Sequence, residues 1–315
     1  MTADDAPAPP ASPLPEPAGA RPARLAVGVV SAGRVGAVLG AALAAAGHVV
    51  VATSGVSDRS VRRAEELLPG VPLLAPDEVV RRADLVLLAV PDDALPGLVR
   101  GLAVSGAFRA GQIAAHTSGA HGVSVLAPAV EAGVLPLALH PVMTFTGRQE
   151  DLARLAACSF GVTAADEPGW SVGEALVVEM GAEPVRVPEH ARPLYHAALA
   201  HGANHLAVLV RDAADVLHQA GIGSPERVLG PLLSAALDNA LRHGDRALTG
   251  PVARGDAETV RAHLRVLDHE MPELADAYRV MARRTAARAV DAGLLAADAA
   301  EAVRAVLYDN SEADR

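Results

Sequence analysis

The chain has 315 residues, of which 51% are hydrophobic, and its formal net charge at pH 7 is −10. This length and apolar content supply the core of one large or two ordinary domains, without the long apolar run of a membrane span. The acidic balance and the few aromatic residues (three Phe, three Tyr and one Trp) argue against nucleic-acid binding. We therefore expect no nucleic-acid partner and, because no apolar run has the length of a membrane span, no membrane partner.

The first segment, residues 1–24, is rich in Pro and Ala and is expected to be a disordered tail. It carries acids where a secretory signal is basic, so the protein is expected to be cytoplasmic. The single cysteine, Cys158, has no partner for an internal disulfide, and its apolar surroundings predict a buried, unreactive thiol.

Residues 25–188 alternate short apolar runs with segments of helical character, which predicts an α/β domain with a doubly wound parallel sheet. The runs lack alternating polarity, as expected of strands buried on both faces. They read RLAVGVV, HVVVATS, ADLVLLAVP, QIAAHTSG, LPLALHP, CSFGVTA and EPVRVP. Residues 189–315 predict a second, all-α domain, with Pro193 in a first helical turn and breaks at GIGSPE, TGPVARGD and HEMPE.

The first apolar run leads into SAGRVG, which is close to the G-x-G-x-x-G fingerprint of dinucleotide-binding loops. Ser31 stands at the first glycine position, while Gly33 and Gly36 fill the two positions that need close approach. A small hydroxyl at the first position is compatible with a phosphate at a helix N-terminus. We therefore expect a dinucleotide to contact this loop through Ser31, Ala32, Gly33, Arg34, Val35 and Gly36.

The end of the second predicted strand distinguishes between NAD and NADP. NAD binders place an acid roughly 20 residues beyond the first glycine, but here Thr53 and Ser54 occupy that region. Arg59 follows, together with Arg62 and Arg63, and guanidinium groups suit a 2′-phosphate. The nearby Asp58 weakens this distinction, and some of these arginines belong to a solvated helix face. We predict NADP(H), with Ser54 and Arg59 as contacts.

Three further strand ends carry polar or turn residues, and strand ends are where such sheets bind ligands. The first is Val90–Pro91, followed by Asp92 and Asp93. The second is His116, followed by Thr117, Ser118 and Gly119, and the third is His140–Pro141. Val90, Pro91 and His116 are predicted to contact the cofactor. His140 has two readings that we weigh equally, a backbone turn or a side chain that lines the substrate pocket.

Taken together, SAGRVG, AVPDDAL, HTSGAHG, LHPVMTFTG, YHAALAHGANH and LTGPVARGD resemble the Rossmann-like family with a C-terminal domain of unknown function, DUF2520. The resemblance covers nearly everything after the tail. That family is similar in plan to 3-hydroxyacid dehydrogenases, pyrroline-5-carboxylate reductases, F420-dependent NADP reductases and ketopantoate reductases, and some members are considered ketopantoate reductases of pantothenate biosynthesis. The resemblance implies an NADP-linked oxidoreductase with a dimerising helical domain, hence a homodimer.

Ketopantoate reductases carry a lysine followed by asparagines four and eight residues later on the corresponding helix. This chain has no lysine, and HAALAHGAN places His196, Ala200 and Asn204 at those positions. At about 100° per residue, positions eight apart lie about 80° apart around a helix. His196 is therefore predicted to donate the proton and Asn204 to orient the substrate, with Ser118 or water as the alternative donor.

Two other groups have competing interpretations. His201 and His205 have the spacing of helical zinc ligands, but no third ligand is evident, so no metal is predicted. In LTGPVARGD, Thr249 and Arg254 are candidate substrate contacts, with Arg254 as a carboxylate clamp. The alternative for this loop is a purely structural pair between Arg254 and Asp256.

The sequence thus favours NADPH-dependent reduction of a small 2-oxo acid, with ketopantoate as the best single candidate. Two alternatives remain. One is another C=O or C=N reductase of this architecture, such as a pyrroline-type or F420-linked enzyme. The other is a non-catalytic NADP(H)-binding protein that has lost its proton donor.

Overall fold

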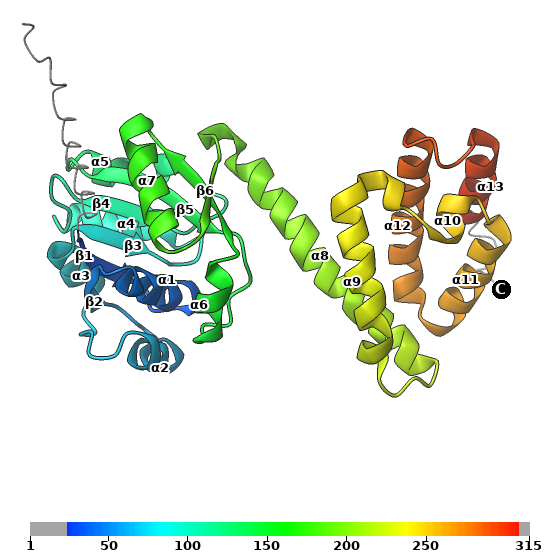
Figure 1. Ribbon diagram of the computed structural model, residues 1–315, viewed down its shortest axis with the longest axis horizontal. Helices are drawn as coiled ribbons and strands as arrows, with labels where there is room; N and C mark the ends of the chain where they lie inside the picture. The colour runs from blue at the N-terminus through cyan, green and yellow to red at the C-terminus, as the bar shows by residue number, and fades with distance from the viewer. Residues whose placement is uncertain (1–23, 309–315) are drawn as a thin grey trace, which may run out of the picture. The chain divides into compact units, whose positions relative to one another are not determined.

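The computed structural model describes residues 24–308 and divides the chain into two compact units, Met1–Leu199 and Ala200–Arg315 (Figure 1). The division falls within one helix, α8 (Arg192–Gln219). The tail predicted for residues 1–24 lies outside the described residues, apart from Arg24.

The first unit contains a seven-stranded sheet, and each strand lies within one of the seven predicted runs. The order is β2-β1-β3-β4-β5-β6-β7. The strands are β1 (Ala26–Val30), β2 (Val49–Thr53), β3 (Leu85–Leu88), β4 (Ile113–His116), β5 (Leu135–Pro141), β6 (Ser159–Ala164) and β7 (Glu183–Arg186).

The predicted parallel sheet is confirmed with one exception: β6 pairs with β5 in the antiparallel direction, while the other pairs are parallel. The segment between these strands does not cross back over the sheet, so β6 starts at the edge where β5 ends. The edge strand β7 is mostly exposed and is not buried on both faces. The antiparallel pairing places His140 opposite Gly161.

Helices cover both faces of this sheet (Figure 1). The side chains of β3 alternate between the two faces. Leu85 and Leu87 join a core with α1 (Arg34–Ala45), α6 (Glu150–Leu155) and α7 (Glu167–Glu179). Val86 and Leu88 face the other way, toward α3 (Pro76–Arg82) and α4 (Leu95–Val104). The remaining helices are α2 (Asp58–Leu67), η1 (Val123–Leu126), α5 (Ala127–Val130) and η2 (Glu189–Ala191). A strand that alternates between two cores has to be apolar throughout, which explains the unbroken runs.

The second unit is helical, and its helices break at the three predicted places. Besides the rest of α8, it contains α9 (Pro225–His243), η3 (Gly244–Ala247), α10 (Gly250–Arg254), α11 (Ala257–Glu270), α12 (Pro272–Asp291) and α13 (Ala297–Tyr308). Helices α10 to α13 share a core that includes Val260 and Val303. Among the described residues, no helix combines the length and apolar character that a membrane crossing requires.

Candidate functional site

The strand order reverses between β1 and β3, and ligands bind such sheets at the carboxyl ends of the strands beside this point. Val30, Leu88, His116 and Ala138 lie in one register row across β1, β3, β4 and β5. The loops that follow these residues therefore lie side by side. They contain most of the site residues predicted for the first unit.

The loop after β1 is held by Ser54 at the end of β2. Its Oγ accepts a hydrogen bond from the Ser31 amide (2.9 Å), and its carbonyl accepts one from the Ala32 amide (2.6 Å). Ser31 has a φ of +78° and is the one non-glycine residue with positive φ in the described part of the chain. A left-handed backbone strains a residue that has a Cβ, and such strain gathers at functional sites. Ser31 thus adopts a backbone that glycine normally supplies at this position.

The two glycines of the loop differ in what surrounds them. A Cβ on Gly36 would collide with the Ser31 carbonyl oxygen, so α1 starts against the loop only because Gly36 lacks one. A Cβ on Gly33, the N-cap of α1, would meet only the Ser31 hydroxyl at 3.4 Å. No side chain caps α1, so its first amides are available to an anion. The Ala32 side chain is fully buried, whereas Arg34 is exposed.

Arginines gather next to this loop on α1 and α2. Within residues 24–308, no ion pair involves Arg34, Arg59 or Arg63. A Cβ on Gly147 would lie 2.5 Å from Nε of Arg63 and 3.0 Å from Cγ of Arg34, so both side chains pack against Gly147. The buried carboxylate of Asp151 fixes this segment by accepting the amides of Thr146 (2.8 Å) and Gly147 (2.7 Å).

Thr53, at the end of β2, is fully buried, and its hydroxyl donates to the Val29 carbonyl at 3.0 Å. Its side chain is therefore used inside the sheet. Strand β3, on the other side of β1, ends at Leu88, before the predicted end at Val90, and the exposed Pro91 begins the turn into α4. The carbonyl of Asp92 in this turn accepts a hydrogen bond from Nε2 of His121 (3.1 Å).

His116, at the end of β4, has no free ring nitrogen. It is fully buried, its Nε2 donates to the Gly122 carbonyl (2.9 Å), and its Nδ1 accepts the Ser118 amide (3.2 Å). Burial lowers the pKa of His116 to about 4. Ser118 is also buried, and its Oγ accepts the His121 amide at 3.1 Å. The ring of His116 is therefore closed to a ligand, while the hydroxyl hydrogen of Ser118 is left to donate.

Arg192 at the start of α8 organises this region from inside. It is fully buried, and no carboxylate among the described residues pairs with it. Its guanidinium donates to the carbonyls of Ser118 (3.2 Å), Ala138 (3.0 Å) and Gly161 (2.8 Å), and Nε donates to Thr163 Oγ1 (2.8 Å). It thereby ties the loop after β4 to β5 and β6.

His140, Tyr195 and His196 meet at the end of β5. His140 Nδ1 lies 2.9 Å from the Tyr195 hydroxyl, and the rings of His140 and His196 are 6.1 Å apart and perpendicular. A Cβ on Gly119 would lie 2.7 Å from His196 Cδ2 and 2.9 Å from His140 Nε2. Burial, aided by the Arg192 cation, lowers the pKa of His140 to about 4, so its ring is neutral at pH 7.

The structure joins predicted residues from three loops and α8, but two further participants were missed. A buried arginine and an exposed one look alike in the sequence, so ARPLYH gave no signal for Arg192. Tyr195 stands beside the predicted His196, and its pairing with His140 depends on the antiparallel contact of β5 and β6. Cys158 is buried as predicted, and burial raises the pKa of its thiol.

The other predicted residues lie in the second unit. Asn204 is exposed on α8, and Arg254 is exposed at the end of α10. Asp256 does not pair with Arg254 but caps α11, accepting the Thr259 amide at 3.1 Å. His201 and His205 hydrogen-bond to each other through their Nδ1 atoms at 2.9 Å. No group of three potential metal ligands occurs within residues 24–308.

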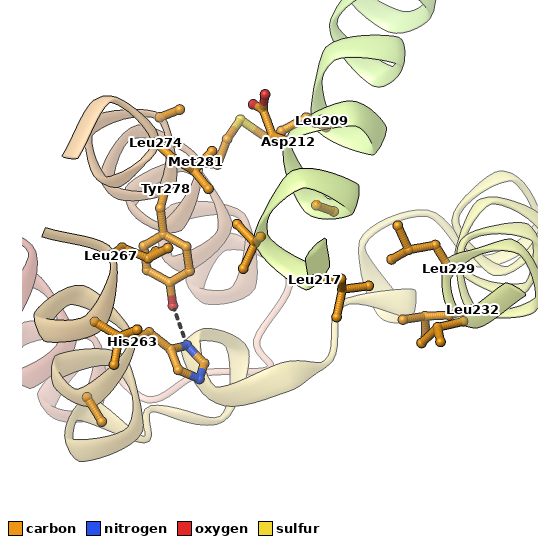
Figure 2. A pocket seen from close by; sticks show the side chains of 16 residues that line it. Leu209, Asp212, Leu217, Leu229, Leu232, His263, Leu267, Leu274, Tyr278 and Met281 are labelled. Carbon is orange, nitrogen blue, oxygen red and sulfur yellow. Dashed lines mark hydrogen bonds between the residues drawn. The ribbon is translucent and has the colours of Figure 1, made fainter. Parts of the chain in front are cut away.

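The second unit also contains a cavity of about 740 Å³ between α8, α9, α11 and α12 (Figure 2). Its lining is almost entirely aliphatic, with polar groups from Asp212, His263 and Tyr278. The Tyr278 hydroxyl and His263 Nδ1 are hydrogen-bonded at 2.9 Å. This lining lacks the cluster of polar groups found at the strand ends.

Residues 11–141 match the family model of a Rossmann-like domain. Residues 158–285 match the family model of a domain of unknown function, DUF2520. No curated protein matches the chain.

Several solved structures share the fold. A candidate NADP oxidoreductase from Bacteroides fragilis is 21% identical with a TM-score of 0.70, and the match covers 83% of this chain and 98% of that one. An imine reductase from a Pseudomonas species is 19% identical with a TM-score of 0.63, and the match covers 90% of this chain and 99% of that one. A pyrroline carboxylate reductase from Plasmodium falciparum with NADP bound is 13% identical with a TM-score of 0.54, and the match covers 90% of this chain and 98% of that one. The two domain matches, in the order seen here, show that the chain belongs to the proteins that combine a Rossmann-like domain with a DUF2520 domain.

Proposed function

We propose that this chain is an NADPH-dependent reductase of a small 2-oxo acid. The observation that carries the proposal is the loop after β1, where Ser31 holds a left-handed backbone and Gly36 lets α1 start against it. The uncapped amides of α1 fit a pyrophosphate, so these residues suit a dinucleotide. The names of the similar structures, an NADP oxidoreductase and two reductases, support the same class.

The preference for NADP(H) over NAD(H) rests on charge. No acid follows β2 at Thr53 and Ser54, and Arg34, Arg59 and Arg63 are not neutralised by carboxylates within the described residues. A 2′-phosphate gains bidentate hydrogen bonds from such guanidinium groups. Because Arg63 packs on Gly147 together with Arg34, we assign Arg63 to this phosphate beside the predicted Arg59.

Cofactor titration followed by fluorescence tests this preference. We expect NADPH to bind more tightly than NADH, and Arg63→Ala to weaken NADPH binding about tenfold or more without affecting NADH. Arg59→Ala tests the second arginine in the same way. Arg82→Ala is the matched control. Arg82 is the last residue of α3 and lies just before β3 begins, so it is at the amino ends of the strands, away from the loop after β1. Equal affinity for the two cofactors in the wild type would refute the preference.

When bound, NADPH supplies a hydride to the electrophilic carbon of the substrate. The product oxygen then needs a proton, and His196 and Ser118 are the proposed sources. Asn204, Thr249 and Arg254 lie in the second unit, and their predicted roles in orienting and binding the substrate stay predictions. His196→Ala is expected to lower the rate of the chemical step by about 10²–10⁴-fold with NADPH affinity unchanged.

Turnover of NADPH with ketopantoate, other 2-oxo acids and cyclic imines tests the reaction itself. Ketopantoate is the first candidate, and the similarity to imine and pyrroline carboxylate reductases makes cyclic imines the second. If NADPH binds but no compound is reduced, the chain is a non-catalytic NADP(H)-binding protein.

The helical unit is proposed to form a homodimer. Along α8 beyond residue 199 Ala214 alone is buried, and on α9 only Pro225 and Leu229 are. Leu232 and Leu241 of α9 are 62% and 79% exposed, and exposed apolar surface of this extent marks an interface. Sedimentation should give a dimer, and Leu241→Glu should shift it toward monomer. A wild-type monomer at all concentrations would contradict the proposal.

A further inference from the structure

His140 and Tyr195 form a pair that the proposed reaction has not yet used. The phenol oxygen lies 2.9 Å from Nδ1, and the rings are perpendicular with centroids 5.6 Å apart. A Cβ on Gly161 would collide with the Tyr195 hydroxyl, so the bare backbone of β6 makes room for it. Arg192, with its guanidinium 5.6 Å from the centre of the Tyr195 ring, packs the pair from inside.

The direction of this hydrogen bond follows from what else touches the two groups. The Gly161 backbone lies beside the phenol oxygen and favours the ionised form of the phenol. Burial nevertheless raises the pKa of Tyr195, so the hydroxyl keeps its hydrogen. Within the described residues, Nδ1 of His140 is the hydrogen-bond partner of this hydroxyl, so we infer that Nδ1 accepts its hydrogen. A neutral imidazole that accepts at Nδ1 carries its hydrogen at Nε2.

The Nε2 atom of His140 is free to act. It makes no hydrogen bond within the described residues, and it is not among their fully buried, unpaired polar atoms. The Cα of Gly119 lies beside it, where a Cβ would come within 2.9 Å. Gly119 therefore keeps the Nε2 side of the ring open, next to His196.

We propose that Tyr195 holds His140 in the Nε2–H tautomer, so that His140 donates a hydrogen bond to the carbonyl oxygen of the substrate. This inference rests on the proposed reductase function and narrows its substrate class. A carbonyl oxygen that gains negative charge is stabilised by a fixed donor. A protonated cyclic imine presents an N–H and a positive charge, so it meets a donor and the Arg192 cation where it needs an acceptor.

The groups around His140 keep this donor neutral. From α8 it faces Arg192, Tyr195 and His196, and from the turn after β3 it faces Asp92. Burial and the two cationic or ionisable neighbours Arg192 and His196 lower its pKa to about 4, while Asp92 opposes them. The ring therefore stays a neutral N–H donor at pH values well above 4.

The tautomer can be tested without cofactor or substrate, by NMR of the full-length protein labelled with ¹⁵N-histidine. We expect the His140 signals of an Nε2–H tautomer at pH 7, with no protonation until the pH approaches 4. Tyr195→Phe should mix the tautomers. His263, which is paired with Tyr278 at the same 2.9 Å distance, provides an internal reference. An Nδ1–H tautomer or an imidazolium at pH 7 would overturn the proposal.

The role of the donor is tested by kinetics with 2-oxo acids. His140→Ala should lower kcat by about 10²–10³-fold, the usual loss for one oxyanion donor. His140→Gln keeps an N–H near Nε2 and should recover most of that loss. Tyr195→Phe should lower kcat about tenfold or more in the wild type, as loss of an orienting partner does, but little in the His140→Gln background.

Tyr308→Phe, whose exposed ring is remote in sequence from the pair, is the control and should change nothing. Equal effects of Tyr195→Phe in both backgrounds, or faster reduction of cyclic imines than of 2-oxo acids, would contradict the assignment. A wild type that binds NADPH but reduces nothing would refute the reductase function. The NMR result would still decide the tautomer on its own.

Discussion

Two groups of residues lie at the carboxyl ends of the strands, and they are built by different means. We call them the nucleotide side and the histidine side. The nucleotide side consists of the loop after β1, the end of β2 and the starts of α1 and α2, and it is shaped by backbone. Its defining features are the φ of +78° at Ser31 and the missing Cβ of Gly36. The histidine side consists of the loop after β4, the end of β5, the start of β6 and the first turn of α8.

Side chains shape the histidine side. Arg192 reaches acceptors on three separate segments, and His140 meets Tyr195 across 55 positions of sequence. The difference teaches that the nucleotide side is encoded by a short local motif, whereas the histidine side exists only once the sheet has formed. Perturbations of the two sides should therefore differ in kind as well as in size.

The largest effect is expected from Arg192→Met on the histidine side. It leaves the carbonyls of Ser118, Ala138 and Gly161 without their donor inside the protein. Because buried acceptors without a partner are costly, the free energy of unfolding should fall by at least about 3 kcal/mol. Urea denaturation measures it. Arg186→Met, which breaks an exposed ion pair with Glu167, is the control and should change little; equal losses would show that burial of Arg192 is not what matters.

The next effect is a fall in the free energy of unfolding as the pH decreases. It arises from two histidines of the histidine side. The folded rings of His116 and His140 resist protonation until about pH 4, whereas unfolded histidine takes up a proton near 6.5. The unfolded state therefore binds more protons in this interval. The contribution is complete above about pH 6.5 and is lost toward pH 4, at up to about 1.4 kcal/mol per pH unit and ring.

Urea denaturation across this pH range measures the slope. His140→Gln should make it shallower, because one of the two rings no longer titrates. An unchanged slope in that variant would show that folded His140 takes up its proton as readily as unfolded histidine does, so that its pKa is not lowered by folding.

On the nucleotide side, Gly36→Ala should impair cofactor binding. Its Cβ would collide with the Ser31 carbonyl, and overpacking costs typically 1–3 kcal/mol. If the strain is relieved by moving the loop, NADPH affinity falls roughly ten- to a hundredfold. Gly101→Ala on α4, where a Cβ meets nothing within 4 Å, is the matched control. Unchanged NADPH binding by Gly36→Ala would show that the loop does not contact the cofactor.

The smallest effect is expected at Ser31. Ser31→Val places a β-branched residue at positive φ and should lower the free energy of unfolding by about 1–2 kcal/mol. Ser31→Gly should be neutral within about 1 kcal/mol, since relief of strain is offset by chain entropy. Thermal denaturation of both variants measures the difference. Equal stabilities would mean that Ser31 does not hold the left-handed backbone in solution.

The contrast also explains what the sequence predicted and what it did not. The seven strands and the loop from Ser31 to Gly36 were predictable because apolar runs and glycine spacing are local properties. The reversed direction of β6 was not, because it depends on the path of the chain after β5. Once β6 reverses, Gly161 faces His140 and opens space for Tyr195, a contact that no local pattern contains.

The structure adds contacts that local patterns do not contain. His116 follows a strand like the other predicted contacts, but its ring is closed off by Gly122 and Ser118. Arg59 is closest in sequence to the motif, yet Arg63 packs on Gly147, where the loop after β5 approaches α2. Arg59 therefore stays a prediction, and Arg63 is added to it as a proposed contact.

The most direct test of the division of labour is single-turnover reduction of ketopantoate by NADPH in the wild type, Arg63→Ala and His140→Ala. We expect the wild type to oxidise NADPH. Arg63→Ala should need more NADPH to saturate but reach nearly the wild-type rate, whereas His140→Ala should saturate normally and react about 10²–10³-fold more slowly. If both variants lower the same parameter, or the wild type fails to oxidise NADPH, the division into a nucleotide side and a histidine side is contradicted.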